Sequence, residues 1–356
     1  MRIILSMLCG LSPGGTGRSE LIARDLHKGT YKKGPDQMKL AFVGKGGSGK
    51  TTLAALFSRH LATAGLPVLA IDADINQHLG AALGLEEDGA AALPPMGLEI
   101  DRIKEHLRGT NPRISSVASM VKTTPPGGGS NLIRLDERNP ICDRFQRDVE
   151  GVRLMVTGPF QESDLGLACY HSKVGAVELL LNHLLDREGE YVVVDMTAGA
   201  DSFASGMFTK FDVTFLIAEP TRRSIAVYRQ YKDYAREYGV RIKVVGNKVS
   251  SDDDLCFLRE EVGADLLTWV RWSPFVRAAE KGRPRPFSEL EPASRKALQD
   301  MLAEADRAPR DWEKFYRQAV EFHVRNAHRW ASAAAGEDLT TQIDPDFLLH
   351  PDLQPS

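Results

Sequence analysis

Short apolar runs alternate with amphipathic segments along most of the chain. Runs of strand length occupy residues 39–43, 67–72, 152–156, 191–195, 213–218 and 241–246, with a further candidate at 264–270. Between them, apolar residues recur every three or four positions, as at Leu53, Leu56, Phe57 and Leu61, which predicts helices with one buried face. Further helical patterns cover residues 173–185, 224–237 and 254–261. Uniformly apolar strands separated by helices indicate a parallel sheet covered on both faces, so we predict a doubly wound α/β fold.

The same pattern divides the chain into regions. Residues 38–290 carry the alternating strands and helices, interrupted at 84–150 by a proline- and glycine-punctuated insertion of short elements and mobile loops. Two helical stretches follow at 293–305 and 311–330, and they form a C-terminal extension over 291–330. The last segment, 331–356, contains three prolines and is expected to be a flexible tail.

Residues 1–37 precede the first strand. Met1–Leu11 faintly resembles a signal peptide, with one positive charge before a short apolar stretch, but no small-x-small cleavage site follows it. We therefore expect residues 1–37 to form a poorly ordered extension, with Met38 a candidate start codon, and we expect the protein to be cytoplasmic.

Composition excludes several classes of protein. The 356 residues carry 45 Lys and Arg against 48 Asp and Glu, a net charge of −3, which weighs against a generally basic nucleic-acid binder. The four cysteines are widely separated and form no C-x-x-C pair, so neither a disulfide scaffold nor a self-contained zinc ribbon is expected. No apolar run reaches the roughly 18–20 residues that span a bilayer.

A phosphate-binding loop follows the first strand. Gly44, Gly49, Lys50 and Thr51 satisfy the spacing G-x-x-x-x-G-K-[ST]. Glycines allow a tight turn whose N–H groups converge on phosphate oxygens, and the next helix adds its positive N-terminal end. We expect Lys50 to reach the β and γ phosphates and Thr51 to place its hydroxyl on Mg²⁺. The other residues expected to contact the nucleotide here are Gly46, Gly47, Ser48 and Thr52.

A second lysine inside the loop, Lys45, makes the motif more specific. The run G-K-G-G-x-G-K-T-T resembles the deviant Walker A motif of the MinD/ParA family of ATPases. The resemblance implies that Lys45 crosses a dimer interface to the partner's nucleotide, so that ATP joins two subunits into a homodimer. It also implies slow hydrolysis of ATP and regulated contact with a protein client.

Two further segments agree with this resemblance. Asp72 and Asp74 end the second strand, and Asp195 ends the apolar run 191–195, with Gly199 four residues later. By resemblance, Asp74 positions or activates water, Asp72 and Asp195 belong to the Mg²⁺ shell, and the Gly199 amide senses the γ-phosphate. From the residues alone, Asp74 could instead cap a helix and Asp195 could be a turn signal.

A later strand ends in Gly246-Asn247-Lys248. The side-chain amide of Asn247 both donates and accepts, which suits an adenine edge, and Asn247 resembles the base-reading asparagine of the family. A guanine-reading N-K-x-D motif would need Asp where Ser250 stands, so ATP is favoured over GTP. The runs 274–276 and 282–284 resemble the segment that closes over the base.

Within the family, the chain most resembles the accessory ATPases of carbon monoxide dehydrogenase maturation (CooC-like), which help insert nickel. The segments that support this are Asp72-Ala73-Asp74-x-Asn76, residues 194–199, Glu219-Pro220-Thr221-Arg222-Arg223-Ser224 and residues 246–249. Those ATPases carry a C-x-C pair, of which only Cys169 is present here, because Leu167 stands at the other position. Cys169 with His171 could supply a Cys₂His₂ site for Ni²⁺ or Zn²⁺ across a dimer, but a buried cysteine and a helix-capping histidine are the favoured explanation.

The stretch 311–330 is amphipathic. Trp312, Phe315, Ala319 and Phe322 lie on its apolar side. MinD proteins bind membranes through a C-terminal amphipathic helix, but acidic residues dilute the positive charge here, and docking onto the core or a partner is favoured. A positioning or scaffold ATPase that binds membrane or DNA in its ATP state is therefore the alternative to a maturation ATPase.

Overall fold

The computed structural model describes residues 38–74, 76–86, 89, 93–159, 170–185, 189–197, 203 and 206–350. The chain divides into two units, 1–35 and 36–356, and the description below concerns the second. The predicted extension 1–37 and the last residues, 351–356, lie outside the described residues.

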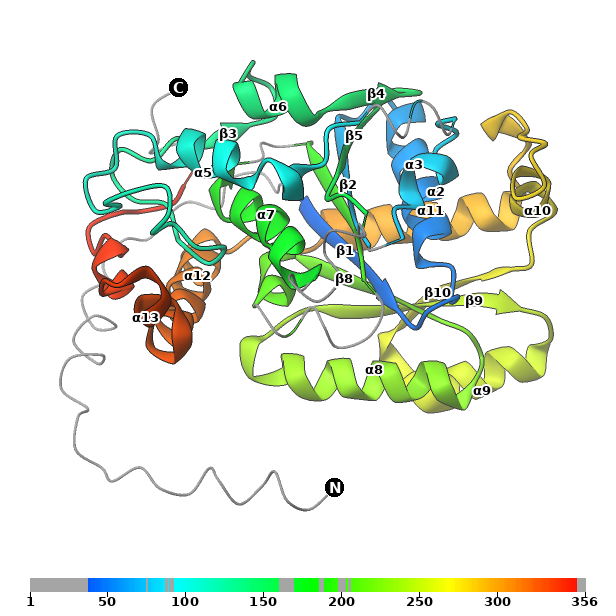
Figure 1. Cartoon of the computed structure of the whole chain (residues 1–356). Coiled ribbons are helices and arrows are strands. Elements are labelled where there is room, and N and C mark those ends of the chain that lie inside the picture. The colour runs from blue at the N-terminus through cyan, green and yellow to red at the C-terminus, as the bar shows by residue number, and fades with distance from the viewer. Residues whose placement is uncertain are drawn as a thin grey trace. The chain divides into compact units, whose positions relative to one another are not determined.

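A mostly parallel sheet forms the centre of this unit (Figure 1). Its strand order is β10-β9-β8-β1-β7-β2-β5-β4, and only β4 runs antiparallel to its neighbour. The strands are β1 (Met38–Gly44), β2 (Val68–Ala73), β4 (Arg147–Val149), β5 (Val152–Val156), β7 (Tyr191–Met196), β8 (Val213–Ala218), β9 (Ile242–Val249) and β10 (Leu266–Arg271). The doubly wound fold is confirmed, and the candidate strand at 264–270 is β10.

Helices cover both faces of this sheet, and α12 and α13 pack in separate clusters. The helices of the described chain are α2 (Lys50–Thr63), α3 (Leu79–Ala82), α5 (Ile100–Arg108), α6 (Pro140–Phe145), α7 (Tyr170–His183), α8 (Arg222–Ala235), α9 (Asp252–Val262), α10 (Pro274–Ala279), α11 (Pro292–Asp306), α12 (Trp312–Asn326) and α13 (Ser332–Ala335). Short 3₁₀ helices occupy Met96–Leu98, Met207–Lys210, Arg236–Tyr238, Gly263–Asp265, Phe287–Glu289 and Leu339–Gln342, and a π-helix occupies Ala327–Ala331.

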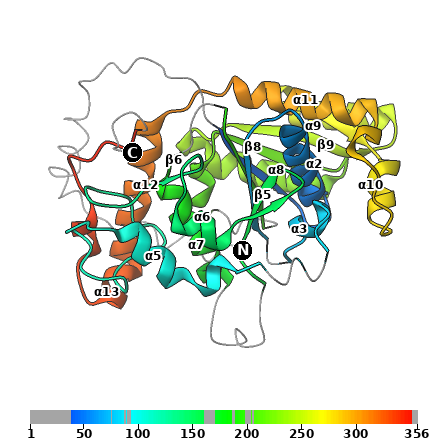
Figure 2. The same ribbon diagram turned by 90° about the horizontal axis from the view of Figure 1, so that it is seen from above.

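Alternating strand residues build two separate cores. In β1, Ala41 and Val43 face a cluster that includes α5, α7, α8 and α9, whereas Leu40 and Phe42 face a cluster that includes α2, α3 and α11. The two layers are visible from above in Figure 2. Every residue of β1, β2, β7 and β8 is buried, which is why these strands read as continuous apolar runs.

The insertion between β2 and β5 consists of short elements. It contributes α5, α6, the edge strand β4 and the two-residue strand β3 (Ile133–Arg134). Strand β3 pairs in parallel with β6 (Leu184–Leu185), so the helix predicted for 173–185 ends at His183, where the backbone leaves the helix to join this small sheet.

The C-terminal extension packs on the core. Helix α11 buries Leu298 and Met301 against the α2 side of the sheet, and α12 buries Trp312 and Phe315 in a cluster with Leu185 and Leu349. The predicted helix 311–330 begins at Trp312 and changes to a π-helix at Ala327. The apolar side of α12 is therefore covered by the core, as docking requires.

Residues 331–350 also contact the core. The Gln342 amide donates to the Ser119 carbonyl at 2.9 Å and accepts from the Thr124 hydroxyl at 3.0 Å, and the Leu339 side chain is fully buried. The expectation of a flexible tail did not anticipate these contacts. In the described part of the chain, no helix is long and apolar enough to cross a membrane.

His183 gives the fold a pH dependence that can be measured. Its ring is fully buried, Nδ1 lies 2.9 Å from the Leu179 carbonyl oxygen, and burial lowers its pKa to about 4. The unfolded chain takes up this proton near the ordinary value of about 6.5, so the stability that depends on neutral His183 is lost as pH falls from 6.5 to 4. Relative to His183→Leu, the free energy of unfolding of the wild type should drop by about 3 kcal/mol between pH 7 and pH 4 in denaturant titrations. The same substitution at the exposed His328 serves as the control, and parallel curves for wild type and His183→Leu would contradict this prediction.

Candidate nucleotide-binding site

The polar residues predicted to be functional meet at one edge of the sheet. Strands β1, β2, β7 and β9 are parallel, so their carboxyl ends lie together and bring the loop after Gly44 close to Asp72, Asp195 and Asn247. Asp72 and Asp195 are direct partners in the register of β2 and β7. This edge is where doubly wound folds bind their ligands.

The loop between β1 and α2 has the backbone of a phosphate-binding loop. Gly47 and Gly49 adopt φ values of 79° and 93°, which side-chain-bearing residues rarely adopt. A Cβ at position 49 would also lie 2.2 Å from the Asn247 amide nitrogen, so glycine is required there twice over. Helix α2 begins at Lys50 with no side-chain cap and no acidic residue in its first turn. Its first N–H groups are therefore available to an anion.

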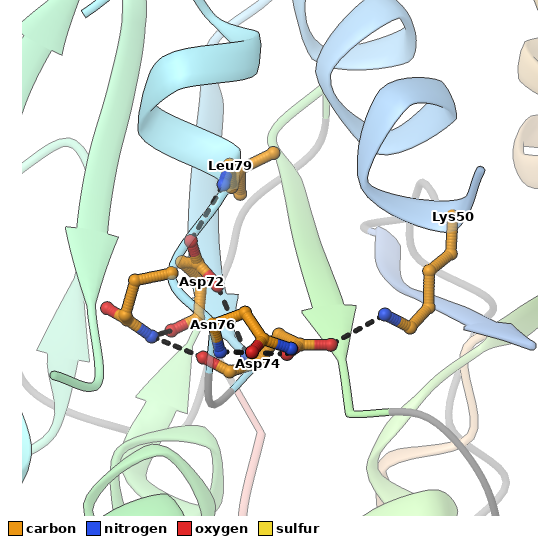
Figure 3. Close-up of polar contacts among 6 residues, drawn as sticks. Lys50, Asp72, Asp74, Asn76 and Leu79 are labelled. Carbon is orange, nitrogen blue, oxygen red and sulfur yellow. Dashed lines mark hydrogen bonds and ion pairs between the residues drawn. The ribbon is translucent and has the colours of Figure 1, made fainter. Parts of the chain in front are cut away.

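Lys50 forms a buried ion pair with Asp74. The ammonium and the carboxylate Oδ2 are 2.6 Å apart, and both side chains are more than nine-tenths buried. The other oxygen, Oδ1, accepts from the backbone and side-chain N–H groups of Asn76 at 3.0 and 2.9 Å (Figure 3). Burial alone would raise the pKa of Asp74, but Lys50 and Asn76 more than offset it and hold the pKa below its ordinary value. Asp74 is thus charged and held in one orientation facing Lys50.

Asp72 and Asp195 are the other two carboxyl groups at this edge of the sheet, and their pKa values are raised rather than lowered. Burial raises the pKa of Asp72 to about 8, with a further contribution from the charge of Asp195. Burial also raises the pKa of Asp195 to about 7, although the Lys50 ammonium and the Thr51 hydroxyl favour its charged form. The Asp72 oxygens accept from the Leu79 N–H at 2.8 Å and from the Asp74 N–H at 3.2 Å (Figure 3).

These two carboxyl groups are suited to different roles toward a cation. The Thr51 hydroxyl lies near enough to favour the charged form of Asp195, but within the described part of the chain neither oxygen of Asp195 accepts a hydrogen bond of normal geometry, whereas both oxygens of Asp72 do. A buried carboxylate without a partner is costly unless a cation is provided. Oxygen ligands of this kind, with a hydroxyl beside them, fit Mg²⁺, so Asp195 and Thr51 suit direct ligation and Asp72 suits orientation of the shell.

Asn247 and Lys248 brace the phosphate-binding loop from β9. The Asn247 amide nitrogen donates to the Ser48 carbonyl at 2.6 Å, and its oxygen accepts from the Lys248 N–H at 2.9 Å. The Lys248 ammonium donates to the Gly47 carbonyl at 2.6 Å and pairs with Glu219 at 2.7 Å. Sequence reasoning did not predict this bracing role, and recognition of adenine by Asn247 remains a prediction.

A cavity of about 940 Å³ opens over the loop. The predicted residues Gly46, Gly47, Thr51 and Thr52 line it, together with Lys50, Asp74, Asn247 and Lys248. Sequence analysis missed other lining residues, among them Lys122 from the insertion, Met207 and the half-exposed Trp272 after β10. Trp272 lies two residues before the run 274–276, which was expected to close over the base. Its position beside this run is the sequence signal that could have identified it as a lining residue.

Lys45 occupies a different position from Lys50. Its side chain is half-buried and is not part of the cavity lining, and its ammonium has no hydrogen bond or ion pair within the described part of the chain. Lys50, by contrast, is buried and lines the cavity. Of the two lysines of the motif, only Lys50 lines the cavity among the described residues.

Three predicted site residues fall outside what the structure describes. Gly199 and Cys169 are not among the described residues, and of His171 only the backbone is described. Among the described residues, no group of three or more His, Cys, Asp or Glu side chains could hold a metal ion by itself.

Comparison with known protein families identifies this site. A model of the CobQ/CobB/MinD/ParA nucleotide-binding domain matches residues 40–284, which is more than half of the chain. The chain belongs to this family. The predicted resemblance to MinD/ParA-type ATPases is thus confirmed, and with it the P-loop, nucleotide-binding character of the fold.

Individual relatives extend the comparison. The carbon monoxide dehydrogenase accessory protein CooC of Rhodospirillum rubrum is 28% identical over 268 residues, covering 75% of this chain and 95% of its own. An uncharacterised ATP-binding protein of Methanocaldococcus jannaschii is 28% identical over 253 residues, covering 69% and 90%. A plasmid partition protein from Borrelia burgdorferi, solved with AMPPNP, superposes with a TM-score of 0.52 at 13% identity over 75% of this chain and 98% of its own. The last likeness shows the fold alone.

The bracing role of Asn247 can be separated from base recognition. Asn247→Ala should lower the affinity for ATP and for inorganic tripolyphosphate by a similar factor of about 5–10, because the Ser48 carbonyl loses a hydrogen bond worth about 1 kcal/mol. Isothermal titration calorimetry with both ligands measures the two affinities. If only ATP binding weakened and tripolyphosphate binding were unchanged, Asn247 would act on the base and the bracing role would be wrong.

Proposed function

We propose that this protein is a Mg²⁺-dependent ATPase that forms a homodimer around two ATP molecules and couples slow hydrolysis to contact with a protein client in metalloenzyme maturation. The observation that carries the proposal concerns the two lysines of the P-loop: Lys50 is paired with Asp74 and lines the cavity, whereas Lys45 does not line it. Family membership supports nucleotide binding, and the remaining statements are the subject of the experiments below.

Lys50 and Lys45 differ in what already neutralises them. Lys50 is paired with Asp74 at 2.6 Å, so an arriving γ-phosphate competes with a carboxylate for the same ammonium. Lys45 has no such partner in the described part of the chain and is absent from the lining of its own cavity. A lysine ammonium that has no ion-pair partner among the described residues is suited to stabilise phosphate charge across an interface.

The acidic residues supply the remaining parts. Asp195 and Thr51 would ligate Mg²⁺ and Asp72 would hold the shell, while Asp74, released from Lys50 by the nucleotide, would orient the attacking water. When bound, Mg²⁺ neutralises charge on the β- and γ-phosphates. The cavity of about 940 Å³ is large enough for a ligand the size of a nucleotide.

The client is proposed from the relatives. The CooC protein of Rhodospirillum rubrum is named as an accessory protein of carbon monoxide dehydrogenase, and the match covers 95% of it. We therefore propose a metalloenzyme or its assembly factor as the client, in the cytoplasm. The alternative, a positioning ATPase on membrane or DNA, is less well supported, because α12 has its apolar side on the core and the net charge is −3.

The trans role of Lys45 predicts a specific pair of phenotypes. Lys45→Ala should bind ATP within a few-fold of wild type but lose kcat by a factor on the order of 10²–10³, as when a transition-state donor is removed. Lys50→Ala should lose nucleotide binding itself, because it contacts the phosphates in its own chain.

Light scattering with ADP, with ATP, and with an Asp74→Ala variant in ATP measures dimer formation. We expect monomers with ADP and dimers for Asp74→Ala with ATP.

Two outcomes would contradict this assignment. Hydrolysis by Lys45→Ala at the wild-type rate would remove the trans role of Lys45. A monomer under every nucleotide condition would remove the dimer, although ATP binding that depends on Lys50 would still support a P-loop nucleotide site.

Transition-metal binding by the chain itself is tested separately. Because Leu167 replaces one cysteine of the family's pair, we expect nickel or zinc titration to give the same stoichiometry for wild type and Cys169→Ala. Cys256→Ala, which removes an exposed thiol, is the matched control. The loss of one metal ion per dimer in Cys169→Ala alone would instead assign a metal site to Cys169.

A further inference from the structure

The C-terminal helix α12 lies outside the matched family domain, which ends at residue 284, yet it contacts the core beside the nucleotide cavity. The point of contact is Gly206, which immediately precedes the 3₁₀ helix Met207–Lys210. Met207 is buried and lines the nucleotide cavity together with Thr197, two residues after Asp195. Helix α12 is therefore one residue away from the cavity wall.

Phe322 of α12 covers Gly206 directly. Gly206 has a φ of 81°, and a Cβ at this position would lie 2.4 Å from Cγ of Phe322. The ring thus rests on the backbone of a residue that must be glycine both for its conformation and for the space. A displacement of the Phe322 ring would therefore move the Gly206 backbone, because the two are packed without free space between them.

Other aromatic rings extend this contact toward β7. Phe322 lies 5.7 Å from Phe208 and 5.3 Å from Tyr238, and Phe208 lies 4.5 Å from Phe203, measured between ring centroids. Phe203 in turn contacts Tyr231 of α8 at 4.5 Å. We call Phe203, Phe208, Tyr238 and Phe322 the aromatic cluster. It joins the chain between β7 and β8 to both α8 and α12.

Helix α12 is also held in place by hydrogen bonds that do not involve the ring of Phe322. The Lys314 ammonium donates to the Gly239 carbonyl at 2.7 Å, and the Gln318 amide donates to the Tyr238 carbonyl at 2.8 Å. The His323 ring lies 2.9 Å from the Leu339 carbonyl oxygen and 3.3 Å from the Thr123 hydroxyl. These hydrogen bonds fix the position of the helix that carries Phe322.

We propose that α12 is a positioning element of the nucleotide site, in which Phe322 acts through Gly206 to hold the Met207 wall of the cavity at the end that receives the γ-phosphate. The inference rests on the proposed ATPase function. It makes discrimination between ATP and ADP, and the rate of hydrolysis, dependent on a helix that the family domain does not include. We expect binding of the nucleotide's inner phosphates to be independent of α12, because Asn247 and Lys248 hold the loop from β9.

The test compares two truncations in the same helix. Phe322→Ala removes the contact with Gly206, whereas Tyr316→Ala, the matched control, removes a ring of the same helix that packs on Phe347. Phe322→Leu keeps apolar cover over Gly206 and serves as the conservative variant. For each protein we would measure dissociation constants for ADP and for a non-hydrolysable ATP analogue, kcat for ATP, and the melting temperature.

The expected result is a split between binding and turnover. Phe322→Ala should keep the ADP affinity within about twofold, reduce the preference for the ATP analogue, and lose kcat by about 10–100-fold, the scale of a small misplacement at a reacting group. Tyr316→Ala should lose melting temperature but keep both the preference and kcat. Phe322→Leu should lose only part of kcat, because it keeps part of the cover over Gly206, and this partial loss decides the question if Phe322→Ala fails to fold.

Three results would overturn the inference. Wild-type preference and kcat in Phe322→Ala would remove the contact's role, and so would a wild-type kcat in Phe322→Leu if Phe322→Ala does not fold. An equal loss in Tyr316→Ala would make the effect one of general helix docking. In each case wild-type nucleotide binding shows that the proposed function stands; a wild type that binds no adenine nucleotide overturns the proposed function and this inference together.

Discussion

The nucleotide site depends on an excess of buried acid over buried base. Asp72, Asp74 and Asp195 end neighbouring strands, and Lys50 is the cation paired among them in the described part of the chain. One carboxylate is neutralised by the ammonium, and the other two have pKa values raised to about 8 and 7, so they tend to hold protons. A parallel sheet places these groups together because all its strands end at one edge. Burial therefore opposes the simultaneous ionisation of all three acids, and a divalent cation at this edge would favour their charged forms.

The phosphate-binding loop is held by hydrogen bonds from strands that are distant in the sequence. Its glycines supply the turn but no side chains, so the loop cannot stabilise its own shape. Asn247 and Lys248 do this from β9 by bonding to the Ser48 and Gly47 carbonyls. Glu219, at the end of β8, holds Lys248 in turn. Residues at the ends of two strands thus fix a loop that must remain open to an anion, and the rigid sheet preorganises the site.

Features that depend on local sequence were predictable. The strands are continuous apolar runs because both faces are covered, and the P-loop spacing specifies its own turn, so both were identified from neighbouring residues. Features that depend on distant packing were not. The bracing role of Asn247 needs a contact across 199 residues, and the end of α7 at His183 reflects pairing of Leu184–Leu185 with β3. The docking face of α12 was readable from its amphipathic pattern, whereas its contact with Gly206 was not, because a glycine carries no apolar signal.

The contacts of Gln342 have a consequence for biosynthesis. Its amide joins Ser119 and Thr124, which precede it by 223 and 218 residues. A ribosome makes the insertion long before it makes this glutamine, so the loop around Ser119 must wait for the end of translation to gain its partner. All strands of the central sheet are made before this glutamine, so the contacts between the insertion and the C-terminal segment can form only after the whole sheet has been synthesised. Until then, the Ser119 carbonyl and the Thr124 hydroxyl lack these two hydrogen bonds.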